Sequence, residues 1–184
     1  MIVVEVRPDV GGDELVRALD LPAPRATVVL NGTTAECDPG VAGVLADLAA
    51  AARRERLTVL TGGTDAGVFH LFGAAMGEPT APLIGVAPSN HAGVALEPHH
   101  THMVLVDGDT WGDETPVLLA LADKLAPAVA VVCGGGAVTR TEVDGHRAAG
   151  RPVLAVAGSG GVAGELPPVA PDDLVAAVLA ALGV

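Results

Sequence analysis

Short apolar runs recur along the chain and alternate with segments whose apolar residues repeat at helical spacing. The runs lie at 27–31 (TVVLN), 57–61 (LTVLT), 83–87 (LIGVA), 101–107 (THMVLVD), 128–133 (AVAVVC) and 153–157 (VLAVA). Their length and β-branched content are typical of strands that are buried on both faces of a parallel sheet. Helices are predicted over 41–55, 67–76, 113–125, 139–149 and 172–182.

This alternation predicts an α/β fold, Rossmann-like and doubly wound, with a mainly parallel sheet and helices on both faces. Residues 2–6 are expected to add an edge strand, and the rest of 1–26 to form a connector. We expect residues 1–184 to make a single domain. Its ligand crevice should lie at the carboxyl ends of the strands.

The amino-acid composition limits the classes of partner that the protein is expected to bind. Half of the 184 residues are apolar, and the net charge is −12. Nucleic-acid backbones and anionic membranes require clustered Lys and Arg, so we expect neither partner. No apolar stretch approaches the roughly 20 residues that span a bilayer, and the N-terminus lacks the features of a signal peptide. We therefore expect a cytoplasmic protein, with a homo-oligomer left open.

Three glycine-rich turns follow apolar runs, and the first is TGGTDAG (61–67). Glycines at a strand-to-helix turn bring backbone N–H groups to a helix N-terminus, where anions bind. The candidate ligand-binding residues here are Gly62, Gly63, Thr64, Asp65 and Gly67. The alternative is a tight turn in which Thr64 or Asp65 caps the next helix. The only lysine, Lys124, lies in a predicted helix, so this turn is no phosphate-binding P-loop.

The second turn, CGGGAVTRTE (133–142), carries more chemistry. Gly134, Gly135 and Gly136 can wrap a phosphate, Thr139 can donate a hydroxyl, and Arg140 can fork onto a phosphate. Glu142 is a candidate catalytic carboxylate near a ribose, although a Thr139–Glu142 capping box explains the same spacing. The remaining candidate ligand contacts are Asn31 and Gly32 after the first run and Gly158, Ser159 and Gly160 in the third turn.

Three other features have weaker interpretations. Histidines cluster in LEPHHTHMVLVDGDTWGDE (96–114), but no third ligand is fixed nearby, so we expect no metal site. Cys37 and Cys133 are too few and too isolated for a disulfide framework or a thiolate zinc site. Trp111 either stacks on a base or packs over its loop. We also expect no resident cofactor.

An ordered set of motifs resembles the SLOG superfamily: TGGTDAGV (61–68), PLIGVAP (82–88), LEPHHTHMVLVDGDTWG (96–112) and VVCGGG (131–136). The likeness is to the prokaryotic form of the ligand-sensing (LSDAT) domain of melastatin-type transient receptor potential channels, over about 27–160. It implies a Rossmann-like domain that binds a nucleotide-derived ligand such as ADP-ribose or a relative of NAD. The residues that it implicates are Gly62, Gly63, Thr64, Gly67 and Gly134 to Gly136.

The same superfamily contains the Lonely Guy phosphoribohydrolases, whose signature P-G-G-x-G-T-x-x-E ends in a catalytic glutamate. Residues 135–142 match it at the glycines, Thr139 and Glu142, but Gly134 replaces the proline and Val138 the third glycine. A β-branched residue does not readily adopt the left-handed conformation of a glycine, so the loop is expected to be reshaped. We therefore expect ligand binding first and N-glycosidic hydrolysis of a nucleoside 5'-monophosphate as the alternative. A scaffold whose glycine turns bind nothing is the third interpretation.

Overall fold

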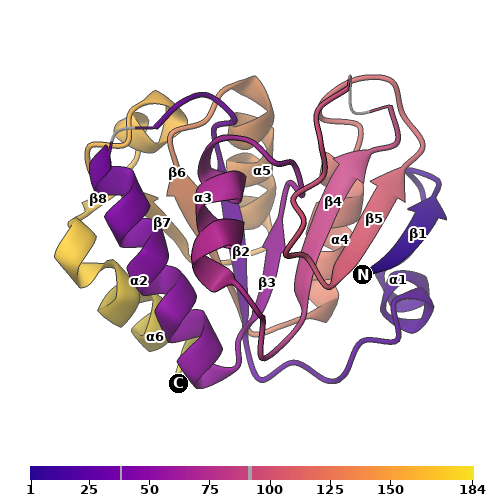
Figure 1. Ribbon diagram of the computed structural model, residues 1–184, viewed down its shortest axis with the longest axis horizontal. Coiled ribbons are helices and arrows are strands. Elements are labelled where there is room, and N and C mark those ends of the chain that lie inside the picture. Colours follow the sequence, from indigo (N-terminus) through magenta and orange to yellow (C-terminus); the bar gives the residue numbers. More distant parts are fainter. Residues whose placement is uncertain (38, 91–92) are drawn as a thin grey trace.

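The computed structural model describes residues 1–37, 39–90 and 93–184, and its centre is one eight-stranded sheet (Figure 1). The strands are β1 (Ile2–Val6), β2 (Thr27–Gly32), β3 (Thr58–Thr61), β4 (Leu83–Pro88), β5 (His102–Val106), β6 (Ala128–Cys133), β7 (Val153–Val156) and β8 (Pro168–Val169). They lie in the order β1-β5-β4-β3-β2-β6-β7-β8, and neighbouring strands pair in parallel.

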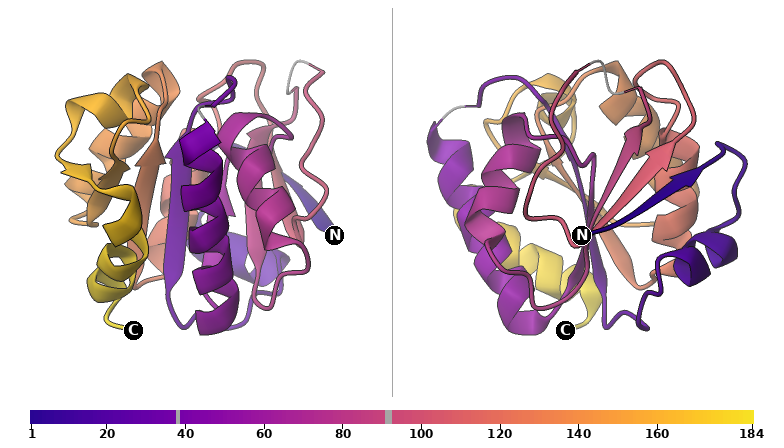
Figure 2. Two further views of the ribbon diagram at one scale, coloured as in Figure 1. Left: turned by 60° about the vertical axis from the view of Figure 1, so that its left-hand side comes forward. Right: turned by 45° about the vertical axis from the view of Figure 1, so that its right-hand side comes forward.

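In the described part of the chain, six α-helices cover the two faces of this sheet (Figure 2). Helices α2 (Pro39–Glu55), α3 (Gly67–Met76) and α6 (Leu174–Leu182) lie on one face, and α1 (Gly12–Ala18), α4 (Thr115–Lys124) and α5 (Ala137–Ala148) lie on the other. Two 3-10 helices, η1 (Gly161–Glu165) and η2 (Pro171–Asp173), flank β8. The predicted Rossmann-like α/β architecture is confirmed.

Each strand in the middle of the sheet supplies apolar side chains to both faces. In β2, Val28 and Leu30 belong to the core beneath α2, α3 and α6, whereas Val29 belongs to the core beneath α1 and α4. Successive side chains of a strand point to opposite faces, so a strand covered on both sides must be apolar at every position. This requirement explains the uninterrupted apolar runs of the sequence.

Several predicted elements and boundaries need correction. Residues 12–18 form α1 instead of a connector, and the two-residue strand β8 was not predicted. Helix α5 begins at Ala137 and not at Thr139, because its N-cap is Gly136, and α4 begins at Thr115. The expected edge strand at 2–6 is present, since β1 lies at one end of the sheet beside β5. Within the described part of the chain, no helix is long and apolar enough to cross a membrane.

The strand order defines where a ligand can bind. From β2 the chain continues through β3, β4 and β5 to one side, and from β6 it continues through β7 and β8 to the other. β2 and β6 are neighbours, with Gly32 opposite Cys133 at their carboxyl ends. The two crossovers leave in opposite directions at this point, so a crevice opens between the loops that follow β2 and β6.

Candidate functional site

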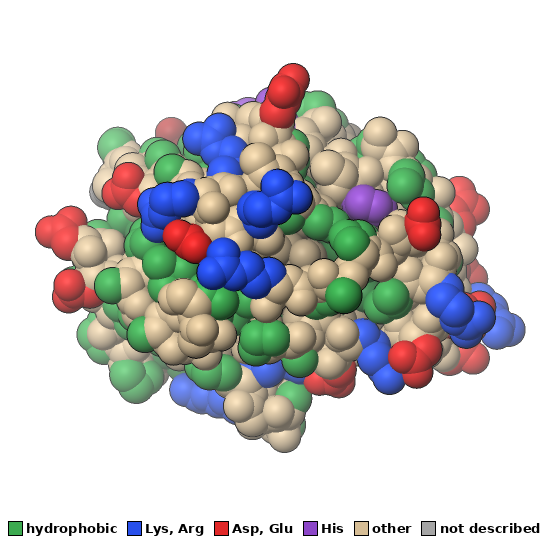
Figure 3. All heavy atoms as spheres, turned by 90° about the horizontal axis from the view of Figure 1, so that it is seen from below, with side chains coloured by type: hydrophobic (Ala, Val, Ile, Leu, Met, Phe, Trp, Pro, Cys, Tyr) green, Lys and Arg blue, Asp and Glu red, His purple; other side chains and the backbone are tan. Residues whose placement is uncertain are grey.

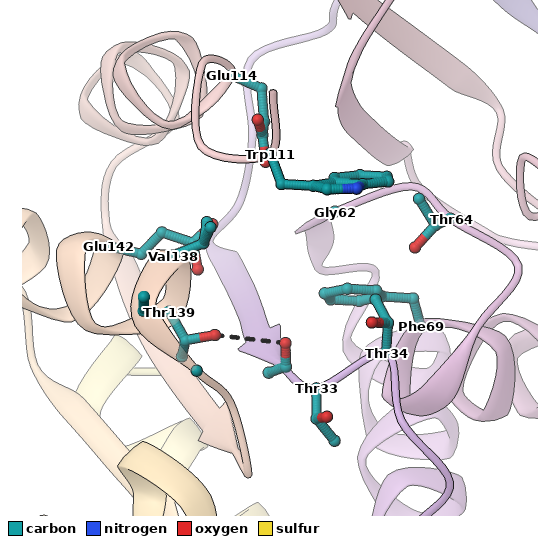
Figure 4. Close-up of a pocket in the computed structure, with 13 residues that line it drawn as sticks. Thr33, Thr34, Gly62, Thr64, Phe69, Trp111, Glu114, Val138, Thr139 and Glu142 are labelled. Carbon is teal, nitrogen blue, oxygen red and sulfur yellow. Dashed lines mark hydrogen bonds between the residues drawn. The ribbon is translucent and has the colours of Figure 1, made fainter. Parts of the chain in front are cut away.

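A cavity of about 340 Å³ occupies this crevice (Figure 4). Its wall comes from the end of β2, the β3–α3 turn, the loop before α4 and the start of α5. The residues that line it are Gly32, Thr33, Thr34, Gly62, Thr64, Phe69, Trp111, Glu114, Gly136, Ala137, Val138, Thr139 and Glu142. Loops from both halves of the sheet therefore meet at one pocket, as the strand order requires.

A buried cluster of hydrogen bonds stabilises the turn between β3 and α3. The Thr61 hydroxyl oxygen accepts a bond from the Gly63 N–H (2.9 Å) and lies 2.7 Å from His100 Nε2. His100 Nδ1 in turn lies 2.7 Å from the Glu97 carboxylate, which also accepts the His99 N–H. This cluster presents Gly62 and Thr64 to the cavity. Within the described residues, no group of three or more His, Cys, Asp or Glu is placed to hold a metal ion.

Thr64 and Asp65 do not cap α3. The N-cap is Ala66, with no side-chain cap, and Asp65 Oδ1 lies 2.6 Å from His70 Nδ1. The Thr64 hydroxyl is buried and has no hydrogen-bond partner among the described residues. Since an unpaired buried hydroxyl is costly, Thr64 offers an unused polar group to anything that enters the cavity.

Gly67 acts through the neighbouring loop and does not line the cavity. Its φ is +51°, and a Cβ there would lie 2.1 Å from the Thr33 carbonyl oxygen. The Val68 N–H donates to that same carbonyl at 3.0 Å. The bare glycine therefore lets α3 dock on the loop that carries Thr33 and Thr34. Gly63 similarly packs against Gly85 and Met103 and does not reach the cavity.

The start of α5 presents unpaired backbone N–H groups. The first helical bond runs from the Arg140 N–H to the Gly136 carbonyl, and Gly136 provides no side-chain cap. The N–H groups of residues 137–139 therefore have no partner within the helix. Thr139 Oγ1 donates to the Gly32 carbonyl (3.3 Å), so the Thr139–Glu142 capping box is wrong (Figure 4). Thr139 joins the loops after β2 and β6 instead.

Glu142 lies in the cavity wall one turn further along α5, buried to all but 7% of its surface. Burial raises its pKa to about 7, the Glu114 carboxyl raises it too, and the Asn31 side chain lowers it. Burial also raises the pKa of Glu114, whose carboxylate accepts the Gly112 N–H at 2.7 Å. The cavity thus holds two carboxyl groups with raised pKa values, and the pKa of Glu142 lies near neutral pH.

Behind Glu142, a row of buried polar groups fixes the orientation of Asn31. The Arg151 guanidinium pairs with Asp123 and donates from Nε to His146 Nδ1 (2.9 Å). Burial, together with the charge of Arg151, lowers the pKa of His146 to about 4, so the ring is neutral. A neutral ring that accepts at Nδ1 must donate at Nε2. Asn31 Oδ1 receives that bond, which leaves its Nδ2 amide without a hydrogen-bond partner among the described residues.

The third glycine turn packs on the second. Gly134 donates its N–H to Ser159 Oγ (3.0 Å), and the carbonyls of Gly134 and Gly135 accept the N–H groups of Ala163 and Val162. Neither glycine lines the cavity, nor do Gly158, Ser159, Gly160 and Asn31. Arg140 is exposed and forms an ion pair with Glu165 (2.6 Å). Ligand contacts at these positions stay a prediction.

Several cavity residues were absent from the predicted set: Thr33, Thr34, Phe69, Glu114 and Ala137. Trp111 was weighed between stacking and packing, and the structure places its indole at the cavity. The one signal for Thr33 and Thr34 was their position directly after a predicted central strand. Glu114 had only its place at the start of a helix to suggest a role.

The comparisons with known proteins agree on the fold. The family model "SLOG in TRPM, prokaryote" matches residues 24–183. The structure of TM1055, a structural genomics target, superposes with a TM-score of 0.60 at 24% identity, over 76% of this chain and 79% of that chain. The molybdenum cofactor binding protein from the phototrophic bacterium Rippkaea orientalis gives 0.58 at 19% identity, over 70% and 74%. No curated protein matches.

Proposed function

The chain belongs to the prokaryotic family of SLOG domains related to TRPM channels, and we propose that its cavity binds a nucleotide-derived ligand of the ADP-ribose or NAD kind. One observation carries the proposal. Aromatic rings, hydroxyl groups, carboxyl groups and the uncapped N-terminus of α5 line a single cavity at the point where the strand order reverses. Each part of a nucleotide has a matching group in that set.

The start of α5 suits a phosphate. Its free N–H groups and the positive end of the helix dipole favour an anion. A Cβ built at Gly136 meets nothing within 4 Å, so the space next to these amides is open. The Thr33 and Thr34 side chains line the same cavity from the facing loop. Together the N–H groups of α5 and the two threonine hydroxyls offer hydrogen-bond donors to a phosphate. They compensate for the absence of Lys and Arg from the described lining of the cavity.

The opposite side of the cavity suits a planar base. The rings of Trp111 and Phe69 lie one above the other, with the opening between them (Figure 4). Trp111 is the single tryptophan of the protein, and 41% of its surface is exposed, which is high for so large an apolar side chain. Stacking a base between the rings removes this apolar surface from water. The carboxyl groups of Glu114 and Glu142 can accept hydrogen bonds from ribose hydroxyls.

The volume of the cavity and one structural neighbour support the same class of ligand. Small-molecule pockets usually measure about 300–1,000 Å³, and this cavity of about 340 Å³ falls within that range. The R. orientalis neighbour is named for binding a molybdenum cofactor, so a protein of this fold is known as a cofactor binder. That likeness supports a small-molecule role and does not identify the ligand.

Thermal-shift measurements test the proposal. A ligand that binds only the folded state raises the midpoint of unfolding, by an amount that grows with its concentration. We expect AMP, ADP-ribose or NAD at about one hundred times its Kd to add about 2.7 kcal/mol to the free energy of unfolding. No shift with any of the three at millimolar concentration would contradict the proposal.

One observation favours a second function, the hydrolysis of a nucleoside 5'-monophosphate to ribose 5-phosphate and free base. Glu142 lies in the cavity wall with a pKa of about 7, which suits a general acid at neutral pH. In this reaction the N-glycosidic bond breaks and the base leaves with the proton of Glu142, while water adds to C1' of the ribose and gives one proton back to the Glu142 carboxylate. Release of free base by the wild type, but not by Glu142→Gln, would establish the activity. Equal release by both proteins would exclude this role for Glu142.

A further inference from the structure

The charged side chains of the cavity restrict the choice of ligand more than the shape of the cavity does. Glu114 and Glu142 line it, and among the described residues of its wall there is no Lys or Arg. Basic side chains gather instead on the opposite face of the molecule, at the amino ends of the strands (Figure 3). That is the edge where α2 ends at Arg53 and Arg54 and where Arg25 pairs with Glu55.

A second, independent feature lies between the two rings. Thr64 lines the cavity and is only 1% exposed, and its buried hydroxyl has no partner within the described residues. Figure 4 shows Thr64 beside the opening that separates Trp111 from Phe69. A ring bound there would bring a polar substituent into reach of this hydroxyl, which can donate or accept one hydrogen bond.

Resting on the proposed function, we propose that the group bound between Trp111 and Phe69 is a cationic planar heterocycle with a polar substituent, of the N-ribosylpyridinium carboxamide class. Aromatic faces attract a cation through the electron density of their rings. The ionised forms of Glu114 and Glu142 add an attraction that a neutral purine does not receive, and a bound cation in turn favours ionisation of both carboxyl groups. The phosphate of the same ligand then lies at the start of α5, away from the two rings.

Neutral and charged ligands of one shape distinguish this inference from simple base stacking. Oxidised nicotinamide mononucleotide carries a pyridinium ring, and its reduced dihydro form carries an uncharged ring of nearly the same size. Because aromatic rings attract a cation but not an uncharged ring, we expect the oxidised form to bind about tenfold more tightly. Isothermal titration calorimetry of the whole chain with each form measures the ratio.

Charge-neutral variants assign the preference to the two carboxylates. Glu114→Gln and Glu142→Gln keep the shape of the protonated acids, so both should fold, and each should reduce the preference for the oxidised form. Asp47→Asn removes one exposed charge from α2, outside the cavity, and should leave the preference intact. This control separates the local carboxylates from the field of the whole acidic protein.

The outcomes separate the inference from the function on which it rests. Tighter binding of the oxidised form, reduced in Glu114→Gln and Glu142→Gln but not in Asp47→Asn, supports the inference. Equal affinity for the two forms overturns it and leaves nucleotide binding standing. Binding of ADP-ribose or AMP with neither mononucleotide bound also overturns only the inference. Failure of every ligand to bind overturns the proposed function as well.

Discussion

His146 Nε2 donates a hydrogen bond to Asn31 Oδ1 at 3.1 Å, and this bond determines which end of the Asn31 amide is left for Glu142. Because Arg151 occupies His146 Nδ1, the imidazole must present its N–H to Asn31. The Asn31 NH2 group is then the end left to interact with Glu142, whose pKa it lowers. A row of residues that never reaches the cavity thus influences the protonation of a carboxyl group inside it.

Replacing Asn31 should change the titration of Glu142. In Asn31→Leu the side-chain amide that lowers the pKa of Glu142 is lost while the volume is nearly kept, so we expect this pKa to rise by about one unit, or about 1.4 kcal/mol. A carbon-13 NMR titration of protein labelled at the glutamate carboxyl groups measures the change. The exposed Glu165 carboxyl, in the same spectra, should not move. An unaltered Glu142 titration would show that Asn31 does not influence it.

Glu142 and His146 should make stability depend on pH in opposite directions. The pKa of Glu142 rises from 4.5 unfolded to about 7 folded, so its contribution is fully present below pH 4.5 and is lost as the pH rises through 7. The pKa of His146 falls from 6.5 to about 4, so its contribution is present above pH 6.5 and is lost as the pH falls through 4. Between about pH 4 and pH 7 the contributions of Glu142 and His146 change in opposite directions and partly cancel.

The variant Glu142→Gln removes the pH-dependent contribution of Glu142 to stability and keeps that of His146. Relative to wild type, we expect it to be equally stable near pH 4 and more stable by about 3 kcal/mol near pH 8, because a neutral amide replaces a buried charge. Urea unfolding at a series of pH values measures the difference. Asp47→Asn should show no such rise. A difference that stays constant with pH would mean that Glu142 titrates normally in the folded protein.

The cluster beneath the β3–α3 turn should be important for stability. Burial raises the pKa of Glu97, but hydrogen bonds from His100 and His99 outweigh it and lower the pKa overall. Glu97→Ala leaves both imidazoles without their partner, so we expect a loss of about 3 kcal/mol in the free energy of unfolding. Chemical denaturation measures it. The exposed Glu14→Ala in α1 should change stability by less than about 0.5 kcal/mol, and a similarly small effect at Glu97 would contradict the assignment.

Gly67 should be intolerant of any side chain. Gly67→Ala combines a positive φ with a Cβ 2.1 Å from the Thr33 carbonyl oxygen, so we expect a loss of about 2 kcal/mol or more. Because Thr33 lines the cavity, ligand affinity should fall as well. Gly164→Ala, where a Cβ meets nothing within 4 Å, serves as the control for both measurements. Equal behaviour of the two variants would exclude a role for Gly67 in docking the loop.

The strands were predictable because burial on both faces leaves a strong mark on the sequence. Short elements leave none: α1 has only seven residues, and β8 consists of Pro168 and Val169. The start of α5 was misplaced for another reason, since Gly136 caps this helix without a side-chain hydrogen bond. Capping signals in the sequence rely on such side chains.

The cavity was predictable in its position but not in all its members. Parallel strands expose their carboxyl ends at one edge, so the glycine turns at 61–67 and 134–136 were expected there. The pairing of β2 with β6 brings Gly32 next to Thr139, more than one hundred positions later, and no local pattern encodes that contact. Thr33, Thr34 and Glu114 enter the cavity wall for the same reason.

Calorimetric titration of a variant with a closed cavity tests the central claim most directly. Gly136→Val places a side chain in the open space beside the start of α5 without a positive φ, and Gly43→Val makes the same change on the exposed side of α2. The account predicts that ADP-ribose or NAD binds wild type and Gly43→Val equally and binds Gly136→Val at least tenfold more weakly. Undiminished binding to Gly136→Val would show that the ligand site lies elsewhere.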